Sequence, residues 1–202
     1  LDPSDITITA GGSTTAASTP VPSNPPGSIP DTAQFTTSAG SSSTISDTTI
    51  TSQLTTSDVV IHTAGGTGGS GNITVNAGVN IVAGSSGWAL TLAADGSGGP
   101  TGGNINITNS TINVDDGVTM LAGWNGVMPP YDSDGNTLSK VDVLPGRGTI
   151  TISGSTIRSP GVSGGGFVEL FAGKDIVLTS STAVQAISVN LDAGNDITTL
   201  NS

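Results

Sequence analysis

Short runs in which an aliphatic residue alternates with a polar or small one recur along most of the chain. Ile73-Thr74-Val75, Ile105-Asn106-Ile107 and Ile150-Thr151-Ile152 are typical. Because successive side chains of a strand point to opposite faces, each triplet can bury two aliphatic side chains and expose the one between them. We therefore predict many short strands with one buried face. Helix should be nearly absent, because β-branched runs broken by Gly and Asn leave no long segment with a period of 3.6 residues.

These strands belong to a repeating unit in which Asn, Asp or Thr stands directly before the first aliphatic residue. The unit recurs at unequal spacing, starting from Asn72, Asn104, Thr149, Asp175 and Asp196. A second unit is interleaved with it and ends in Ala-Gly or Ala-Ala, as at residues 93–94 and 122–123. Two alternating units with small residues at the corners predict an all-β fold, a right-handed parallel β-helix or β-solenoid with an N-terminal strand and an extended linker.

In such a fold, the aliphatic residues of equivalent strands should stack on one another inside the molecule. The predicted core ladder consists of Ile73, Val75, Ile105, Ile107, Ile150, Ile152, Ile176 and Leu178. A buried charge at any of these positions should unfold the neighbouring turns, because an unpaired buried charge costs several kcal/mol.

Proline and glycine mark the expected domain organisation. Residues 1–12 read as an N-terminal strand, and residues 13–43, rich in Pro, Ser, Thr and Gly, read as an extended linker. Residues 44–202 are the predicted β-helix, with a loop extruded at 124–147.

Charge limits the partners that the chain can bind. Four Lys and Arg stand against fifteen Asp and Glu, which gives a formal net charge of −11. Nucleic acid is therefore not an expected partner, because phosphates require a basic surface. Membrane insertion is not expected either, since no run reaches about 18 apolar residues. The chain has no cysteine, so it is not a disulfide scaffold.

The opening of the chain resembles a known family. Leu1-Asp2-Pro3, then Ile6-Thr7-Ile8, a variable Ser/Gly/Pro stretch, Thr49-Ile50-Thr51 with Leu54, and Gly71-Asn72-Ile73-Thr74-Val75 are similar in order to segments of large filamentous-haemagglutinin-like exoproteins of Gram-negative bacteria. The resemblance implies a β-helical adhesin shaft, secreted through a partner pore and located outside the cell or on its surface. One departure is that the Asn-Pro-Asn type motifs of the family's secretion domain have no counterpart here.

Few residues are candidates for chemistry, and we expect no catalytic or cofactor-binding site. His62 is the only histidine and reads as a polar strand position. Asp132, Asp134 and Asn136 place oxygens at alternate positions, as a Ca²⁺ loop would, but the bidentate Glu is missing and a solvated turn is the simpler interpretation. Asp115 and Asp116 could be the paired carboxylates of a β-helix glycosidase or lyase, or simply a turn.

Three functions are therefore compared. The first is a non-enzymatic structural subunit of an extracellular fibre or adhesin shaft, the second a carbohydrate-binding or carbohydrate-active protein with host or cell-surface glycans as partners. The third is a flat Thr array that binds ice. The residue between the aliphatics varies among Thr, Asn, Val and Glu, which argues against a regular array. The first function is favoured.

The favoured function includes assembly of the chain with itself into a head-to-tail homopolymer. The N-terminal strand, through Leu1, Ile6 and Ile8, would dock on the incomplete last turn of a neighbour, through Ile197 and Leu200. Such a heterologous contact does not close and propagates into a filament.

Overall fold

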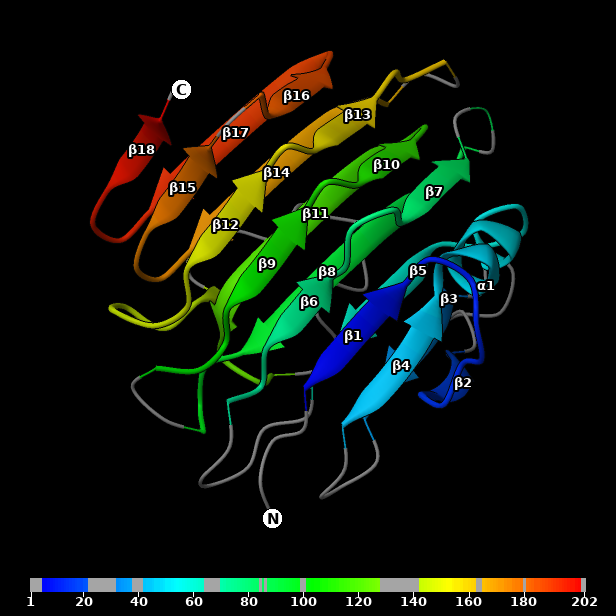
Figure 1. Cartoon of the computed structure of the whole chain (residues 1–202), viewed down its shortest axis with the longest axis horizontal. Coiled ribbons are helices and arrows are strands. Elements are labelled where there is room, and N and C mark those ends of the chain that lie inside the picture. The colour runs from blue at the N-terminus through cyan, green and yellow to red at the C-terminus, as the bar shows by residue number, and fades with distance from the viewer. Residues whose placement is uncertain are drawn as a thin grey trace.

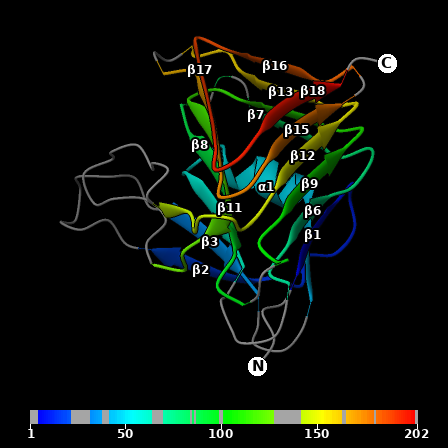
Figure 2. The same cartoon turned by 90° about the vertical axis from the view of Figure 1, so that its left-hand side faces the viewer.

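The computed structural model describes residues 5–21, 32–37, 42–63, 70–83, 85, 87–98, 101–127, 142–162, 165–179 and 181–200. The strands form three sheets that face one another across a shared interior (Figures 1 and 2). Among the described residues there is one α-helix, α1 (Asp47–Gln53).

Sheet 1 has seven strands in the order β18-β15-β12-β9-β6-β1-β4, all parallel. Its strands are β1 (Ile6–Thr9), β4 (Ser43–Ser46), β6 (Ile73–Val75), β9 (Ile105–Thr108), β12 (Ile150–Ser153), β15 (Ile176–Thr179) and β18 (Ile197–Leu200).

Sheet 2 has the order β17-β14-β11-β8-β5-β3-β2, and all its pairs are parallel except β2 with β3. Its strands are β2 (Ala17–Val21), β3 (Thr32–Thr36), β5 (Val59–His62), β8 (Ala89–Asp95), β11 (Gly117–Trp124), β14 (Phe167–Ala172) and β17 (Ser188–Ala193). Sheet 3 has four parallel strands in the order β16-β13-β10-β7: β7 (Asn80–Ala83), β10 (Thr111–Val114), β13 (Thr156–Ser159) and β16 (Ala183–Ala186).

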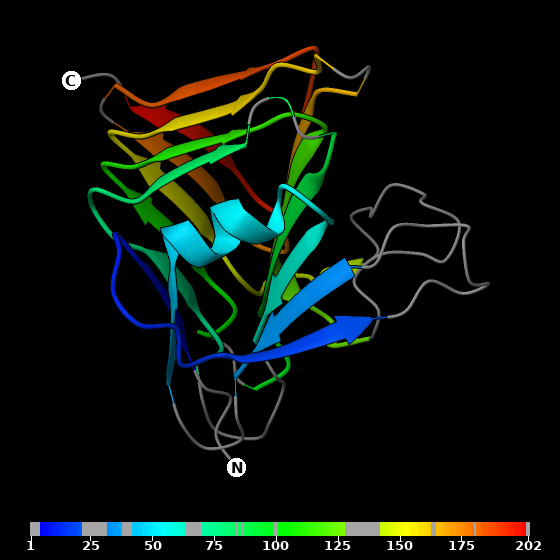
Figure 3. The same cartoon turned by 90° about the vertical axis from the view of Figure 1, so that its right-hand side faces the viewer.

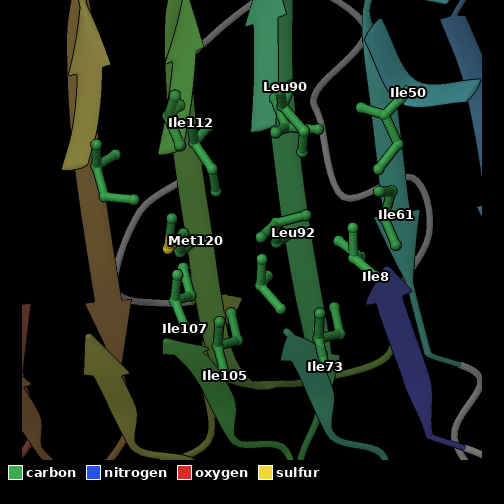
Figure 4. Close-up of a cluster of buried hydrophobic side chains, with 14 of the residues drawn as sticks. Ile8, Ile50, Ile61, Ile73, Leu90, Leu92, Ile105, Ile107, Ile112 and Met120 are labelled. Atoms are coloured by element: carbon green, nitrogen blue, oxygen red, sulfur yellow. The ribbon is translucent and has the colours of Figure 1, made fainter. Parts of the chain in front are cut away.

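The core is continuous and receives aliphatic side chains from all three sheets and from α1 (Figure 4). In sheet 1, Ile73, Ile105, Ile150 and Ile176 follow one another in register, as do Val75, Ile107, Ile152 and Leu178. Seven of these eight residues are buried, and Leu178 is half-buried against the same cluster. Burial of each such side chain contributes about 1.5–3 kcal/mol.

The predicted fold class is corrected by the strand order. An all-β right-handed parallel β-helix with an N-terminal strand and an extended linker would stack its strands in chain order. Here the first strand, β1, lies inside sheet 1 between β4 and β6, β2 and β3 are antiparallel, and a helix stands among the strands. The architecture is a layered arrangement of three mostly parallel sheets with one helix.

The division of the N-terminal region is corrected as well. Residues 13–43 are not wholly an extended linker, because β2 and β3 lie in this range and pair with each other, and β3 also pairs with β5. Ala33 and Phe35 of β3 are buried in the main core, so apolar contacts hold a segment whose Pro and Ser content suggested PPII structure.

Helix α1 forms although Thr, Ile and Ser are poor helix formers. Ser46 is the N-cap, and its hydroxyl accepts a hydrogen bond from the Thr49 N–H at 3.2 Å. Ile50 and Leu54, four residues apart, are both fully buried, so tertiary packing and the cap outweigh propensity.

The loop predicted at 124–147 is described only at its ends. Val143 forms an antiparallel bridge with Trp124, and both belong to a second apolar cluster on the outer face of sheet 2 with Ala93, Leu121 and Phe171. The loop therefore packs back on the sheet at residues 142–147. Asp132, Asp134 and Asn136, the Ca²⁺ candidates, lie outside the described residues.

Candidate interaction surfaces

A ladder of side-chain acceptors joins the residues that precede β1, β6, β9 and β12 of sheet 1. The Asp5 carboxylate accepts from the Asn72 N–H at 2.8 Å, and the Asn72 side-chain oxygen accepts from the Asn104 N–H at 2.9 Å. The Asn104 side-chain oxygen then accepts from the Thr149 N–H at 2.9 Å. Asp5, Asn72 and Asn104 thus each offer an acceptor to the backbone before the next strand, in the direction from β1 towards β12.

All three sheets end on the same side of the molecule, in strands β16, β17 and β18 (Figures 1 and 2). We call these three strands the open end, because within the described chain no strand pairs with their outer edges. Its exposed apolar side chains are Ile187 (70% exposed), Val189 (46%), Ile197 (48%) and Leu200 (56%). By contrast Ile176, which precedes Ile197 in the same register column, is fully buried.

At the opposite side of the molecule, which we call the closed end, the edges of sheets 1 and 3 are covered. Residues 11–16 run beside β4, where the Thr15 and Ala16 N–H groups donate to the Thr44 carbonyl at 2.8 and 3.1 Å. The Ser46 N–H donates to the Thr14 hydroxyl at 3.1 Å. Helix α1 packs beside β7, the outermost strand of sheet 3 (Figure 3).

Asp47 ties the closed end together. Its carboxylate accepts from the Gly11 N–H at 2.9 Å, the Thr48 N–H at 2.8 Å and the Asn80 N–H at 3.0 Å. Burial favours the protonated acid, but these backbone donors outweigh it and hold the pKa of Asp47 below its ordinary value. The side chain therefore joins α1 to the N-terminal segment and to β7.

The predicted assembly residues lie in different environments. Ile6 and Ile8 are fully buried in the chain's own core, and β1 has a strand on each side. In the single chain the N-terminal strand is therefore part of its own sheet, and donation to a neighbour would require it to leave the core. Ile197 and Leu200 are exposed at the open end, and Leu1 lies outside the described residues.

His62 is buried on the outer face of sheet 2. Its ring lies edge-on to Trp124, with 5.5 Å between the ring centroids, and its Nδ1 has no hydrogen-bond partner. Burial lowers its pKa, while the Thr63 backbone and the nearby Asp95 carboxylate oppose this shift. No cluster of three His, Asp or Glu suited to a metal occurs among the described residues.

Asp115 and Asp116 hold a loop rather than facing each other across a cleft. The Asp115 carboxylate is buried and accepts from the Val162 N–H at 2.6 Å and the Gly87 N–H at 3.2 Å. Burial raises the pKa of Asp116, and the neighbouring Asp115 charge adds to this effect. Near the open end, a surface depression is lined by Arg158, Gln185 and Ile187 among others, with a single basic side chain.

Protein-family models, curated protein sequences and solved structures were compared with this chain, and none of the three comparisons gave a match. In the described part of the chain, no helix has the length and apolar character needed to cross a membrane.

Proposed function

We propose that this chain is a structural, non-enzymatic subunit of an extracellular fibre or adhesin shaft, and that it associates through its open end. The proposal agrees with the resemblance to filamentous-haemagglutinin-like exoproteins and with a location outside the cell or on its surface. The observation that carries it is the contrast between Val189 and Ile197, about half exposed at the open end, and their column partners one strand further inside, Val168 and Ile176, which are fully buried.

The edges of the open end supply the second part of the argument. An outermost parallel strand presents unpaired N–H and C=O groups, which favour pairing with a further strand. Where such edges lie beside exposed Ile and Leu side chains, a single protein contact can pair the backbone groups and bury the apolar side chains together. Asp196, which stands before β18 at the position of Asn72 and Asn104, offers the same kind of acceptor to an added strand.

The occupant that we propose for the isolated chain is a second copy, joined open end to open end. The closed end gives the reason: residues 11–16 and α1 cover the edges of sheets 1 and 3, so it offers little for head-to-tail stacking. A contact between two identical surfaces closes on itself and produces a dimer. The exposed acidic residues, which give the chain its negative charge, weaken this contact at low salt.

The test is the state of association of the purified chain over a wide range of concentrations, by analytical ultracentrifugation in moderate salt. We expect a monomer–dimer equilibrium, and we expect the variant Ile197→Lys with Leu200→Lys to remain monomeric. The control Val82→Lys, on the outer face of sheet 3 and also exposed, should dimerise like the parent chain. Circular dichroism establishes that all three are folded.

Two results would contradict the closed dimer formed through the open end, although the second of them would still agree with a fibre subunit. A parent chain that stays monomeric at every concentration would remove the role of the open end in association. Filaments that grow without limit would mean that the closed end also takes part, as in the head-to-tail polymer predicted from the sequence.

A further inference from the structure

The outer face of sheet 1 carries two rows of uncharged side chains, most of them polar. We call it the hydroxyl face. In the first row, the residues between the buried aliphatics lie side by side on six consecutive strands: Thr7, Thr74, Asn106, Thr151, Val177 and Thr198. The second row, two residues further along, contains Thr108, Ser153 and Thr179 in register and ends at Leu200 of β18, and Thr9 has the corresponding position on β1.

The register resolves an objection raised by the sequence alone. Variation of the residue between the aliphatics was expected to spoil a regular Thr array. The structure separates the triplets onto different sheets: Glu169 lies on sheet 2, between Thr119 and Asn190. In the first row of the hydroxyl face only Asn106 and Val177 interrupt the threonines, and neither row contains a charged residue.

Among the described residues no segment lies over the hydroxyl face. Figure 1 looks onto it, with β1, β6, β9, β12 and β15 side by side in front. Within the described chain, the hydroxyls of Thr7, Thr74 and Thr151 form no hydrogen bond with the protein, whereas Thr44, on the outermost strand, is bonded to residues 13–15. Nine of the eleven side chains in the two rows are half-buried by their neighbours, and β-branched Thr is stiff at χ1, so the array is rigid.

The other two outer faces do not share this chemistry. Sheet 3 carries Arg158 between Asn113 and Gln185, and sheet 2 carries Glu169 and is partly covered by the cluster around Trp124. A neutral, repeating face in a chain of net charge −11 matches a neutral, repeating partner.

We infer that the hydroxyl face binds the surface of ice. Adjacent parallel strands lie about 4.8 Å apart and alternate residues along a strand about 6.6 Å apart, so the Thr groups form a two-dimensional lattice. The first spacing is close to a repeat of the oxygen lattice of ice. Hydroxyl groups can take lattice positions, and the Thr methyl groups order water between them without the strong hydration shell of a charge. A sugar would be bound in a concave site lined in part by aromatic rings, whereas none of the residues in the two rows is aromatic.

The experiment measures thermal hysteresis and ice recrystallisation with the purified full chain. We expect the parent chain to slow recrystallisation and to depress the freezing point below the melting point. The variant Thr74→Lys with Thr151→Lys, at the centre of the first row, should behave as buffer alone. Val82→Lys, on the outer face of sheet 3, should retain the full effect.

Thermal unfolding by circular dichroism shows whether a variant has lost ice binding alone or has also lost its fold. Thr151→Val keeps the shape of the side chain and removes one hydroxyl, so it should lose part of the ice-binding activity. The inference is overturned if the parent chain has no hysteresis, or if Val82→Lys loses as much as the double variant. Binding of the parent chain to insoluble cellulose or chitin that the double variant loses, without any effect on ice, would assign the face to neutral glycans instead.

Discussion

One column of sheet 1 provides three identical substitutions at three depths. Ile105, Ile176 and Ile197 occupy equivalent register positions, in the middle of the sheet, one strand from the open end and on the outermost strand. The first two are fully buried and the third is about half exposed. Changing each to Ala removes the same atoms from three different environments.

The expected costs follow from burial. Ile105→Ala leaves a cavity between Ile73 and Ile150, so the free energy of unfolding should fall by about 2–5 kcal/mol. Ile197→Ala leaves no enclosed cavity and loses only part of the transfer free energy, which gives about 1 kcal/mol or less. Ile176→Ala should lie between them, because the exposed strand β18 can move towards the space.

Urea unfolding followed by circular dichroism measures these three differences, at a protein concentration low enough to keep the chain monomeric. The slopes must agree among variants before midpoints are compared, since a change in slope would mean that the strands no longer unfold together. The reasoning fails if Ile197→Ala costs as much as Ile105→Ala, or if Ile105→Ala costs less than about 1 kcal/mol.

Two further predictions concern pH and backbone geometry. Burial lowers the pKa of His62, so the unfolded chain takes up a proton before the folded chain does as pH falls. The contribution of neutral His62 to the free energy of unfolding is therefore present above about pH 6.5 and is lost below it. The decrease in Tm between pH 7.5 and 5.5 should be smaller in His62→Phe than in the parent chain. An equal loss in both proteins would refute a role for His62. Gly148 and Gly146 both have positive φ (68° and 73°), but a Cβ at Gly148 would collide with the backbone of Ala122 and Gly123, whereas Gly146 faces open space. Gly148→Ala should therefore lower the free energy of unfolding by more than about 3 kcal/mol and Gly146→Ala by about 1–2 kcal/mol, measured in the same denaturation assay.

The local pattern of the sequence predicted strands and their buried faces well. The triplets around Ile73, Ile105 and Ile150 are strands, with the aliphatic residues inside. This information is local, because alternation within three or four residues fixes which side chains share a face. The acceptor ladder is also visible in the local sequence, because Asn or Asp stands directly before the strands whose side chains supply the acceptors.

Features that depend on distant pairing were not predicted. Nothing near Ile6 indicates that β1 lies between β4 and β6, because that placement depends on segments far along the chain. Helix α1 was missed because its stability comes from the burial of Ile50 and Leu54 and not from propensity. The hydroxyl face could not be recognised because triplets of similar composition lie on different sheets, and only the register separates Thr151 from Glu169.

The pairing pattern also bears on the order in which the structure can form. From β9 onward, each strand pairs on one side with a strand that came three elements earlier, so its partner strand already exists when it is synthesised. β1 lies between β4 and β6 and precedes both in the chain, so both can pair with it as soon as they are synthesised. Each added strand then closes only a modest loop, which keeps the entropic barrier low. The molecule can therefore fold from the N-terminus to the C-terminus during synthesis, and at each stage the strands added last form the exposed end of the three sheets.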